Sequence, residues 1–110
     1  MPIALLLDQR NATVSLCHSF TKDLESLVTG SDIIVSATGS PGLIQQKWLK
    51  ANHVIVDVGI TRNSSGSIVG DCFELDSQSV AAYSPVPGGV GPMTIAALAN
   101  NVISAFNAKK

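Results

Sequence analysis

The fold is decided by residues 32–59, which read DIIVSATGSPGLIQQKWLKANHVIVDVG. Apolar residues follow one another without alternation near both ends of this stretch. They predict two strands, over residues 32–38 and 53–58, each buried on both faces. Between them lie a glycine-rich turn, residues 39–42, and a short helix, residues 43–49. Strands joined by a crossover of this length are typical of a parallel sheet with right-handed connections.

On the N-terminal side, helix and strand patterns alternate in the same way. Residues 1–10 predict the end of a helix, and residues 12–17 predict a short strand. Thr21 is a suitable N-cap for a further helix that ends at Gly30. Because the chain opens inside a helix without an N-cap, we expect a domain that is truncated at its N-terminal strand.

On the C-terminal side, residues 62–66 are polar and predict a surface hairpin or loop. Residues 72–81 are weakly helical, and residues 82–86 predict a last short strand. Residues 85–92 read PVPGGVGP, a rigid glycine-rich loop, and residues 94–105 predict a clear helix. The whole order predicts an α/β fold, a doubly wound parallel sheet of the Rossmann type, with ligands outside the carboxyl ends of its strands.

Composition narrows the classes of function. The 110 residues carry a formal net charge of −1 without a basic stripe, so nucleic acid is not an expected partner. No apolar run reaches the roughly 18 residues of a membrane span, so we expect no membrane partner. Cys17 and Cys72 are expected to be reduced thiols of a cytoplasmic protein, or of one in a mitochondrial or plastid matrix.

Side chains suited to catalysis are sparse. The sequence has no convincing Ser/His/Asp set and no His/Cys spacing suited to zinc, so it predicts neither catalytic residues nor a metal site. No side chain is a convincing general acid or base for a reacting carbon. The candidate residues are therefore binding residues.

The ends of the predicted strands supply those candidates. His18 and Ser19 follow the strand over residues 12–17, where an NAD-specific fold would place an acid to bind the ribose 2′-hydroxyl. These neutral side chains tolerate or favour a 2′-phosphate, or they merely open the loop. Thr38 and Gly39 begin a turn of small residues, which lets a flat group approach the backbone closely or is an ordinary turn.

Two further positions complete the set. Ile60 ends the segment 57–60, whose backbone is suited to a nicotinamide carboxamide, whereas Asp57 is expected to hold a neighbouring loop by accepting backbone hydrogen bonds. The loop of residues 85–92 can line a planar ligand or close a site, or it is a tight strand-to-helix connection. Thr94 is expected to cap the final helix rather than to touch a ligand.

Several of these segments together resemble one known family. Residues 85–94, PVPGGVGPMT, look like the signature of the bifunctional methylenetetrahydrofolate dehydrogenase/methenyltetrahydrofolate cyclohydrolase enzymes. Residues 11–14 and 17–19 are similar to the family's second Rossmann strand, and residues 54–60 and 69–71 match two further blocks in the right order. The resemblance covers essentially all 110 residues.

The resemblance implies an oxidoreductase and hydrolase of one-carbon metabolism. It would oxidise 5,10-methylenetetrahydrofolate with NADP, NAD being the less expected cofactor, and would hydrolyse the methenyl product to 10-formyltetrahydrofolate. Ser19 would lie near the adenosine 2′-phosphate and Ile60 at the nicotinamide, and we place His18, Thr38 and Gly39 in the same cofactor site. The residues that flank the tetrahydrofolate derivative would be Pro87, Gly88, Gly89, Val90 and Gly91.

The resemblance also implies a domain organisation. Residues 1–110 would be the C-terminal portion of the NAD(P)-binding domain of an enzyme that is usually a homodimer. The family's first Rossmann strand with its Gly-Arg-Ser phosphate turn, and an N-terminal folate domain with the catalytic lysine and tyrosine, would precede Met1. The position after Ser19 is often basic in the family and is Phe20 here. Phosphate preference would then depend on Ser19, His18, Lys22 and the missing arginine.

Three functions are compatible with these observations. The chain is the cofactor-binding part of such an enzyme and is inactive by itself, or it is a catalytically inactive nucleotide-binding or dimerisation fragment. A different Rossmann dehydrogenase is the third candidate, and the loop of residues 85–92 argues against it. We also expect a sheet that lacks its central strand to be marginally stable or self-associating.

Overall fold

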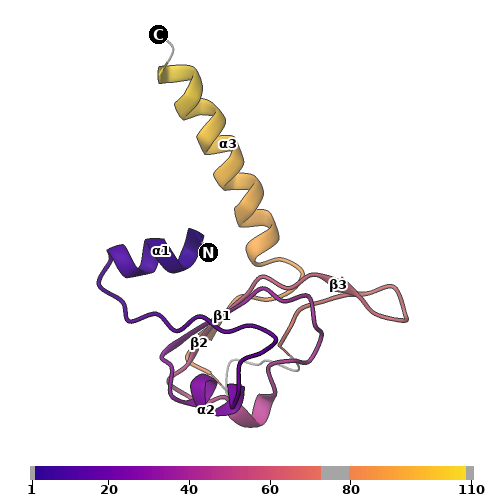
Figure 1. Ribbon diagram of the computed structural model, residues 1–110. Helices are drawn as coiled ribbons and strands as arrows, with labels where there is room; N and C mark the ends of the chain where they lie inside the picture. Colours follow the sequence, from indigo (N-terminus) through magenta and orange to yellow (C-terminus); the bar gives the residue numbers. More distant parts are fainter. Residues whose placement is uncertain (1, 73–79, 109–110) are drawn as a thin grey trace.

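The structure, a computed structural model, describes residues 2–72 and 80–108 (Figure 1). These described residues form α1 (Pro2–Gln9), α2 (Leu24–Thr29), β1 (Ile33–Ser36), the 3-10 turn η1 (Gln46–Trp48), β2 (Val54–Asp57), β3 (Thr61–Arg62), β4 (Ile68–Val69), β5 (Ala82–Tyr83) and α3 (Val90–Ala108).

The centre of the fold is a three-stranded parallel sheet in the order β1–β2–β5. The register pairs Ile33 with Val54 and Ser36 with Asp57, so the carboxyl ends of β1 and β2 lie at one edge. Strands β3 and β4 form a separate antiparallel hairpin directly after β2. The predicted α/β fold with a parallel sheet and the predicted hairpin are both confirmed.

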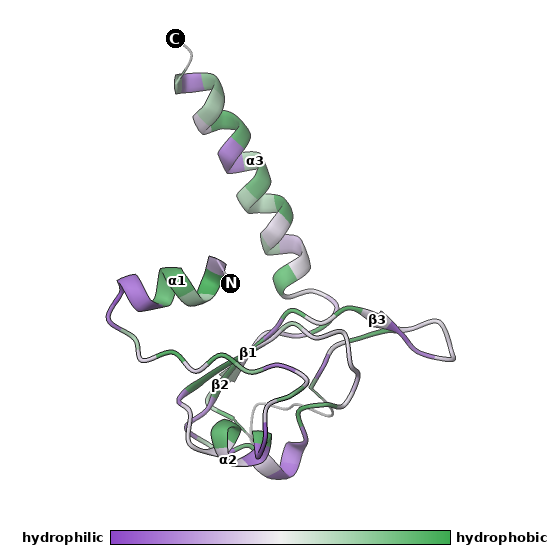
Figure 2. Ribbon diagram, viewed as in Figure 1, coloured by the Kyte–Doolittle hydropathy of each residue, from purple (hydrophilic) through white to green (hydrophobic). Residues whose placement is uncertain are grey.

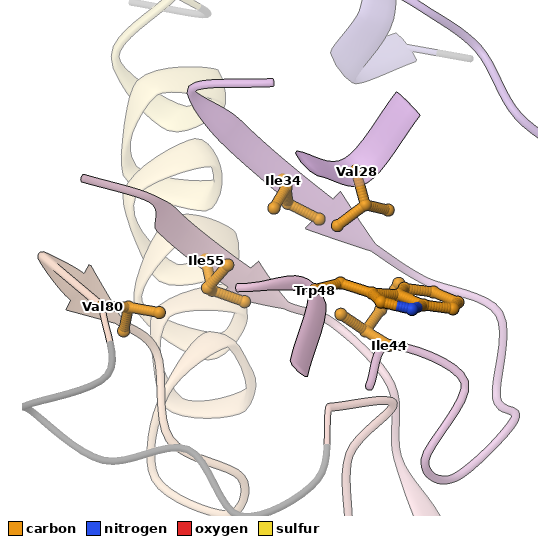
Figure 3. Close-up of a cluster of buried hydrophobic side chains, with 6 residues drawn as sticks. All are labelled: Val28, Ile34, Ile44, Trp48, Ile55 and Val80. Carbon is orange, nitrogen blue, oxygen red and sulfur yellow. The ribbon is translucent and has the colours of Figure 1, made fainter. Parts of the chain in front are cut away.

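The core lies on one face of this sheet (Figure 3). Its buried apolar side chains come from α2, β1, the segment around η1, β2 and the residues just before β5, and they are Val28, Ile34, Ile44, Trp48, Ile55 and Val80. Burial alternates along β1, where Ile33 is 56% exposed and Ile34 is 7% exposed. The prediction that both faces of this strand are buried is therefore wrong, because no helix in the described part of the chain covers the second face.

The strand predicted over residues 12–17 is also wrong. These residues are extended and exposed, and they pair with no strand among the described residues. A strand needs a neighbour that accepts and donates its backbone hydrogen bonds, and β-branched residues alone do not supply one. A cavity of about 520 Å³ separates this segment from β1.

Two helix starts differ from their predictions. Helix α2 begins at Leu24, after Asp23 in a left-handed conformation with φ 57°, so Thr21 is not its N-cap. Gly30 does end α2, as predicted. Helix α3 begins at Val90, and the Thr94 hydroxyl donates to the Val90 carbonyl at 2.9 Å inside the helix. Thr94 therefore does not cap α3, because that position is already in its second turn.

The remaining elements are shorter than predicted. The helix expected over residues 43–49 is only the single turn η1, and the strand expected over residues 82–86 is limited to β5. Most of the weak helix predicted over residues 72–81 lies outside the described residues.

Helices α1 and α3 extend away from the sheet (Figure 1). Neither contains a buried residue, although apolar residues run along both of them (Figure 2). Among the described residues, no helix combines the length and the hydropathy that crossing a membrane would require.

Candidate functional site

The site predicted from the strand ends divides into two cavities. The larger, of about 520 Å³, runs along β1 between α2 and the extended segment of residues 15–19. His18, Ser19 and Thr38 line it, so the structure brings these three candidates together although 19 residues separate Ser19 from Thr38. Its size is typical of a small-molecule pocket, and apolar side chains such as Leu24 and Ile34 share its lining with polar ones such as Ser31 and Ser40.

A local turn fixes His18 at the mouth of this cavity. The His18 backbone N–H donates to Thr21 Oγ1 at 2.8 Å, and the Thr21 N–H donates to the His18 carbonyl at 2.9 Å. The Phe20 N–H donates to His18 Nδ1 at 3.1 Å, so the neutral imidazole carries its proton on Nε2 as a donor. Phe20 itself is 87% exposed, and its ring and the His18 ring pack in an edge-type arrangement with their centroids 6.2 Å apart.

The smaller cavity, of about 190 Å³, lies between the end of β2 and the loop of residues 85–92. Ile60 lines it together with all five residues predicted to flank the folate, namely Pro87, Gly88, Gly89, Val90 and Gly91. Val90 and Gly91 already belong to the first turn of α3, so the loop itself is shorter than predicted. The structure thus places the expected nicotinamide and folate positions against one cavity.

The glycines of this loop are required by its shape. Gly88 has φ 105°, a backbone conformation that residues with a Cβ rarely adopt. A Cβ at Gly89 would clash with the Pro85 carbonyl oxygen. Backbone therefore forms the wall of the smaller cavity at these two positions.

Asp57, at the end of β2, has the structural role that the sequence predicted. It is 2% exposed and accepts the backbone N–H groups of Gly59 (2.9 Å), Asp71 (3.0 Å) and Cys72 (2.9 Å). Its own N–H donates to Ser84 Oγ at 2.8 Å, beyond β5. Asp57 therefore ties the segment after the hairpin to the centre of the sheet.

Asp71 is a residue that sequence reasoning missed. It is 0% exposed, and its Oδ2 accepts the Ser36 hydroxyl (2.7 Å), the Thr38 N–H (2.7 Å) and the Thr38 hydroxyl (2.9 Å). Its Oδ1 is buried without a hydrogen-bond partner in the part of the chain that the structure describes. The sequence did contain a signal for Asp71, because Gly70 and Asp71 come directly after the short apolar run of residues 68–69. Asp57 and Gly59 stand in a similar way at the end of the apolar strand β2.

Electrostatics around the two carboxylates follow from these contacts. Burial by itself raises the pKa of Asp71, but hydrogen bonds from Ser36 and Thr38 and the backbone of Gly39 outweigh burial and leave the pKa below its ordinary value. Burial, with the negative charges of Asp57 and Asp71 nearby, raises the pKa of the Cys72 thiol to about 12. Asp71 is thus ionised and Cys72 is protonated near neutral pH.

Two glycines make this arrangement possible. A Cβ at Gly59 would clash with Asp71 Oδ1, and a Cβ at Gly70 would clash with Asp57 Oδ2. Each glycine therefore lies against the carboxylate of the other segment. Any side chain at either position would push the two carboxylates away from the strand ends.

The chemistry of the site is that of binding rather than of proton transfer. The described residues contain no cluster of three or more His, Cys, Asp or Glu side chains that would hold a metal ion. Asp57 and Asp71 are buried and engaged with backbone and hydroxyl donors, which leaves neither available as a general base. What the site offers is backbone, small side chains and neutral donors along the carboxyl edge of a parallel sheet.

Parallel strands that present such groups at their carboxyl ends are the arrangement of dinucleotide-binding domains. Residues 1–110 match the family described as tetrahydrofolate dehydrogenase/cyclohydrolase, NAD(P)-binding domain. The chain therefore belongs to the tetrahydrofolate dehydrogenase/cyclohydrolase family, and the part it represents is the NAD(P)-binding domain.

Individual relatives agree with this assignment. The chain is 49% identical over 109 residues to the bifunctional protein FolD of Aquifex aeolicus, a match that covers 98% of this chain and 37% of that protein. It is 46% identical over 108 residues to the mitochondrial C-1-tetrahydrofolate synthase of Schizosaccharomyces pombe, with 94% of this chain and 11% of that protein covered. The chain thus spans only a minor part of the length of these relatives.

Solved structures share the fold. The bifunctional FolD enzyme of Campylobacter jejuni superimposes with a TM-score of 0.94 at 44% identity, over 99% of this chain and 39% of that one. The FolD enzyme of Trypanosoma brucei, crystallised with NADP cofactor and an inhibitor, gives a TM-score of 0.88 at 40% identity, over 98% and 39% of the two chains.

Proposed function

We propose that this chain supplies the cofactor-binding side of an NADP-dependent 5,10-methylenetetrahydrofolate dehydrogenase that also hydrolyses the methenyl product to 10-formyltetrahydrofolate. The observation that carries the proposal is the shared cavity of Ile60 and residues 87–91. Hydride transfer needs the donor carbon and the acceptor ring in contact and correctly oriented. A single cavity whose walls are the expected nicotinamide and folate positions supports that requirement.

The cofactor would lie along the carboxyl edge of the sheet. Its adenosine end would occupy the larger cavity near His18 and Ser19, and its nicotinamide end would reach Ile60. The Thr38–Gly39 backbone connects the two ends, because Thr38 lines the larger cavity and the Gly39 carbonyl accepts the hydroxyl of Thr61, the neighbour of Ile60, at 3.1 Å. These small residues would let the dinucleotide lie directly against the backbone.

NADP is the proposed cofactor rather than NAD. No acid stands at the end of residues 12–17, where an NAD-specific fold binds the ribose 2′-hydroxyl. The His18 Nε2–H and the Ser19 hydroxyl are neutral donors that suit a phosphate oxygen. Phe20 adds no charge at the position after Ser19, so the donors of His18 and Ser19, together with the cation of Lys22, would bind the phosphate.

This chain's residues would bind and orient rather than move protons. The bound NADP would supply the hydride acceptor, while Ile60 and the glycine-rich loop would hold the nicotinamide and the folate face to face and exclude water from between them. We further propose that residues 1–110 form the C-terminal portion of the cofactor domain, that a separate folate domain supplies the catalytic lysine and tyrosine, and that the whole enzyme is a homodimer of the cytoplasm or an organelle matrix.

A second function is supported by the length of the match. Because the chain spans 37% of the Aquifex aeolicus relative, a catalytically inactive nucleotide-binding or dimerisation fragment of the same family is the alternative. Dinucleotide binding distinguishes the dimerisation form of this alternative: the cofactor-binding side of the enzyme discriminates NADP⁺ from NAD⁺, whereas a fragment that serves only dimerisation binds neither.

Thermal unfolding with and without each dinucleotide tests the proposal. A ligand at about 100 times its dissociation constant stabilises the folded state by roughly 2.7 kcal/mol. We expect NADP⁺ to raise the midpoint, NAD⁺ to raise it less, and S19A to remove most of the difference. S64A, at the exposed tip of the hairpin, is the matched control and should respond like the unmodified chain. No shift with either dinucleotide would reject cofactor binding by this chain and favour the dimerisation fragment.

A further inference from the structure

One buried carboxylate organises the turn at the carboxyl end of β1. Asp71 lies 35 residues from Ser36 along the chain, yet its Oδ2 accepts three hydrogen bonds from Ser36 and Thr38. Two of the three donors belong to Thr38, the first residue of the turn that would meet the cofactor. The contact is thus made from outside the turn, by the segment that follows the hairpin.

The carboxylate is itself held firmly in place. Asp57 accepts the backbone N–H groups of Asp71 and Cys72, so the main chain on both sides of the Asp71 carboxylate is attached to the end of β2. Gly59 and Gly70 allow the two segments to approach without an intervening Cβ. Asp71 therefore links the end of β2, through Asp57, to the end of β1, through Ser36 and Thr38.

The contact also determines what Thr38 can do. Its hydroxyl donates to Asp71 Oδ2 and accepts the Ser40 N–H at 3.2 Å, so that hydroxyl is engaged within the protein. The Thr38 side chain thereby fixes the backbone of residues 38–40. Within this turn the Gly39 carbonyl accepts the Thr61 hydroxyl. Thr38 would then act through the form of the turn rather than as a direct donor to a ligand.

We propose that Asp71 is a positioning residue of the cofactor site, which holds the Thr38–Gly39 turn in the form that receives the dinucleotide. The inference rests on the proposed function and adds to it a residue outside both cavities. The Asp71 carboxylate is fully buried, and its Oδ1 has no hydrogen-bond partner among the described residues. Its Oδ2 accepts three hydrogen bonds, two from Thr38 in the turn and one from Ser36 at the end of β1, and these donors compensate its burial and couple the charge to the shape of the turn.

The test compares D71N with S84A. D71N keeps the size of the side chain but removes the charge, so the bonds to Thr38 weaken. S84A removes the hydroxyl that accepts the Asp57 N–H at the end of β2, lies outside both cavities and leaves both Thr38 bonds intact. Both variants should lower the thermal midpoint. Only D71N should raise the dissociation constant for NADP⁺, by about tenfold, the equivalent of one lost charge-assisted hydrogen bond.

Amide hydrogen exchange supplies a readout that does not need the cofactor. In D71N the amides of Thr38 and Ser40 should lose protection selectively, whereas the amides of β2 should keep theirs. If D71N does not fold, T38V removes the same turn-side hydroxyl donor and should loosen the Ser40 amide while it weakens NADP⁺ binding.

The outcomes separate the inference from the proposed function. If the unmodified chain binds no NADP⁺, the proposed function fails for this chain, and selective loosening of Thr38 and Ser40 in D71N alone would still establish Asp71 as the residue that holds the turn. Equal weakening of NADP⁺ binding by D71N and S84A at equal loss of midpoint would overturn the inference, because Asp71 would then act only through general stability. Unchanged protection of the turn in D71N would overturn it as well.

Discussion

Asp57 Oδ1 accepts the backbone N–H of Asp71 at 3.0 Å, which places two buried carboxylates next to each other at the carboxyl edge of the sheet. Like charges in a protein interior repel each other strongly unless each is compensated. Here the compensation comes from backbone N–H and hydroxyl donors of three separate segments in the described part of the chain. The pair therefore acts as the junction between the strands and the hairpin.

Loss of the Asp57 charge should destabilise the whole domain. An asparagine at this position would turn an N–H donor toward one of the three backbone N–H groups that the carboxylate now accepts. We expect D57N to lower the free energy of unfolding by about 3 kcal/mol, as measured by urea denaturation. E25Q, an exposed carboxylate in α2, is the control and should change it by less than about 0.5 kcal/mol. Equal stability of the two variants would show that Asp57 does not hold the junction.

Alanine at the two close-approach glycines should be poorly tolerated. Because a Cβ at Gly59 or Gly70 would overlap the opposite carboxylate, G59A and G70A should each cost about 2 kcal/mol or more of unfolding free energy. G91A is the matched control, since the space around Gly91 is open and it lies in the first turn of α3. That variant should leave stability unchanged or raise it by up to about 1 kcal/mol. A stable G59A would indicate that the hairpin packs less closely on the sheet than the structure shows.

The two cysteines should differ sharply toward an alkylating reagent. Thiolate is the reactive form, and burial next to Asp57 and Asp71 raises the pKa of the Cys72 thiol to about 12. At pH 8 iodoacetamide should therefore modify the exposed Cys17 and leave Cys72 intact in the folded chain. Peptide mass mapping checks this outcome, and C17S should abolish labelling until the chain is unfolded in urea. Rapid labelling of Cys72 at pH 8 would contradict the closed arrangement of the carboxylates.

Stability should fall in acid partly through Asp71. Its pKa is lowered in the folded chain, so the unfolded chain takes up the proton first as the pH decreases. The stabilising contribution is therefore present above the ordinary aspartate pKa of about 3.9 and is lost as the pH drops through the lower folded pKa. Urea denaturation at several pH values between about 5 and 2.5 should show a shallower pH dependence for D71N than for the unmodified chain. Parallel curves would mean that Asp71 has the same pKa in both states.

Exposed apolar side chains should make the chain self-associate. On α3, Leu98 and Val102 are 63% and 61% exposed and lie on one face, four residues apart. Sedimentation velocity should show species larger than a monomer that become monomeric in L98E/V102E. N100E/S104E adds the same charge elsewhere on the helix and should leave association unchanged. A sharp, reversible unfolding transition of a dilute monomer would contradict the prediction.

Much of the fold could be predicted from local pattern. The apolar runs around Ile34 and Ile55 consist of β-branched residues with a high strand propensity. A crossover of the length that joins them is typical of parallel strands. Gly30 ends its helix as expected, because that role depends on neighbours close in sequence. Asp57 accepts backbone hydrogen bonds as expected, and one of its three donors, Gly59, is only two residues away. The expected positions of Ile60 and residues 87–91 were also derived from sequence, through the resemblance, and the structure brings them to one cavity.

The failures share one physical cause. Residues 12–17 have the composition of a strand, but a strand exists only where another backbone satisfies its hydrogen bonds. Thr21 and Thr94 are good capping residues, but their hydroxyls engage His18 and Val90 instead. For the two threonines the hydroxyl has several partners within reach, and for residues 12–17 the backbone needs a neighbouring strand. In both situations the surrounding structure decides which hydrogen bonds form.

Local stretches of the sequence were enough to predict an α/β fold with a parallel sheet and the family, because apolar runs, turn residues and a ten-residue signature are properties of such stretches. Three features depended on the folded chain as a whole: Asp71 holds the Thr38 turn, Gly59 and Gly70 lie against opposite carboxylates, and the candidates divide between two cavities. The contacts of Asp71 and of the two glycines join residues 12 to 33 positions apart, and they form through the close packing of segments whose separation in space no local pattern specifies.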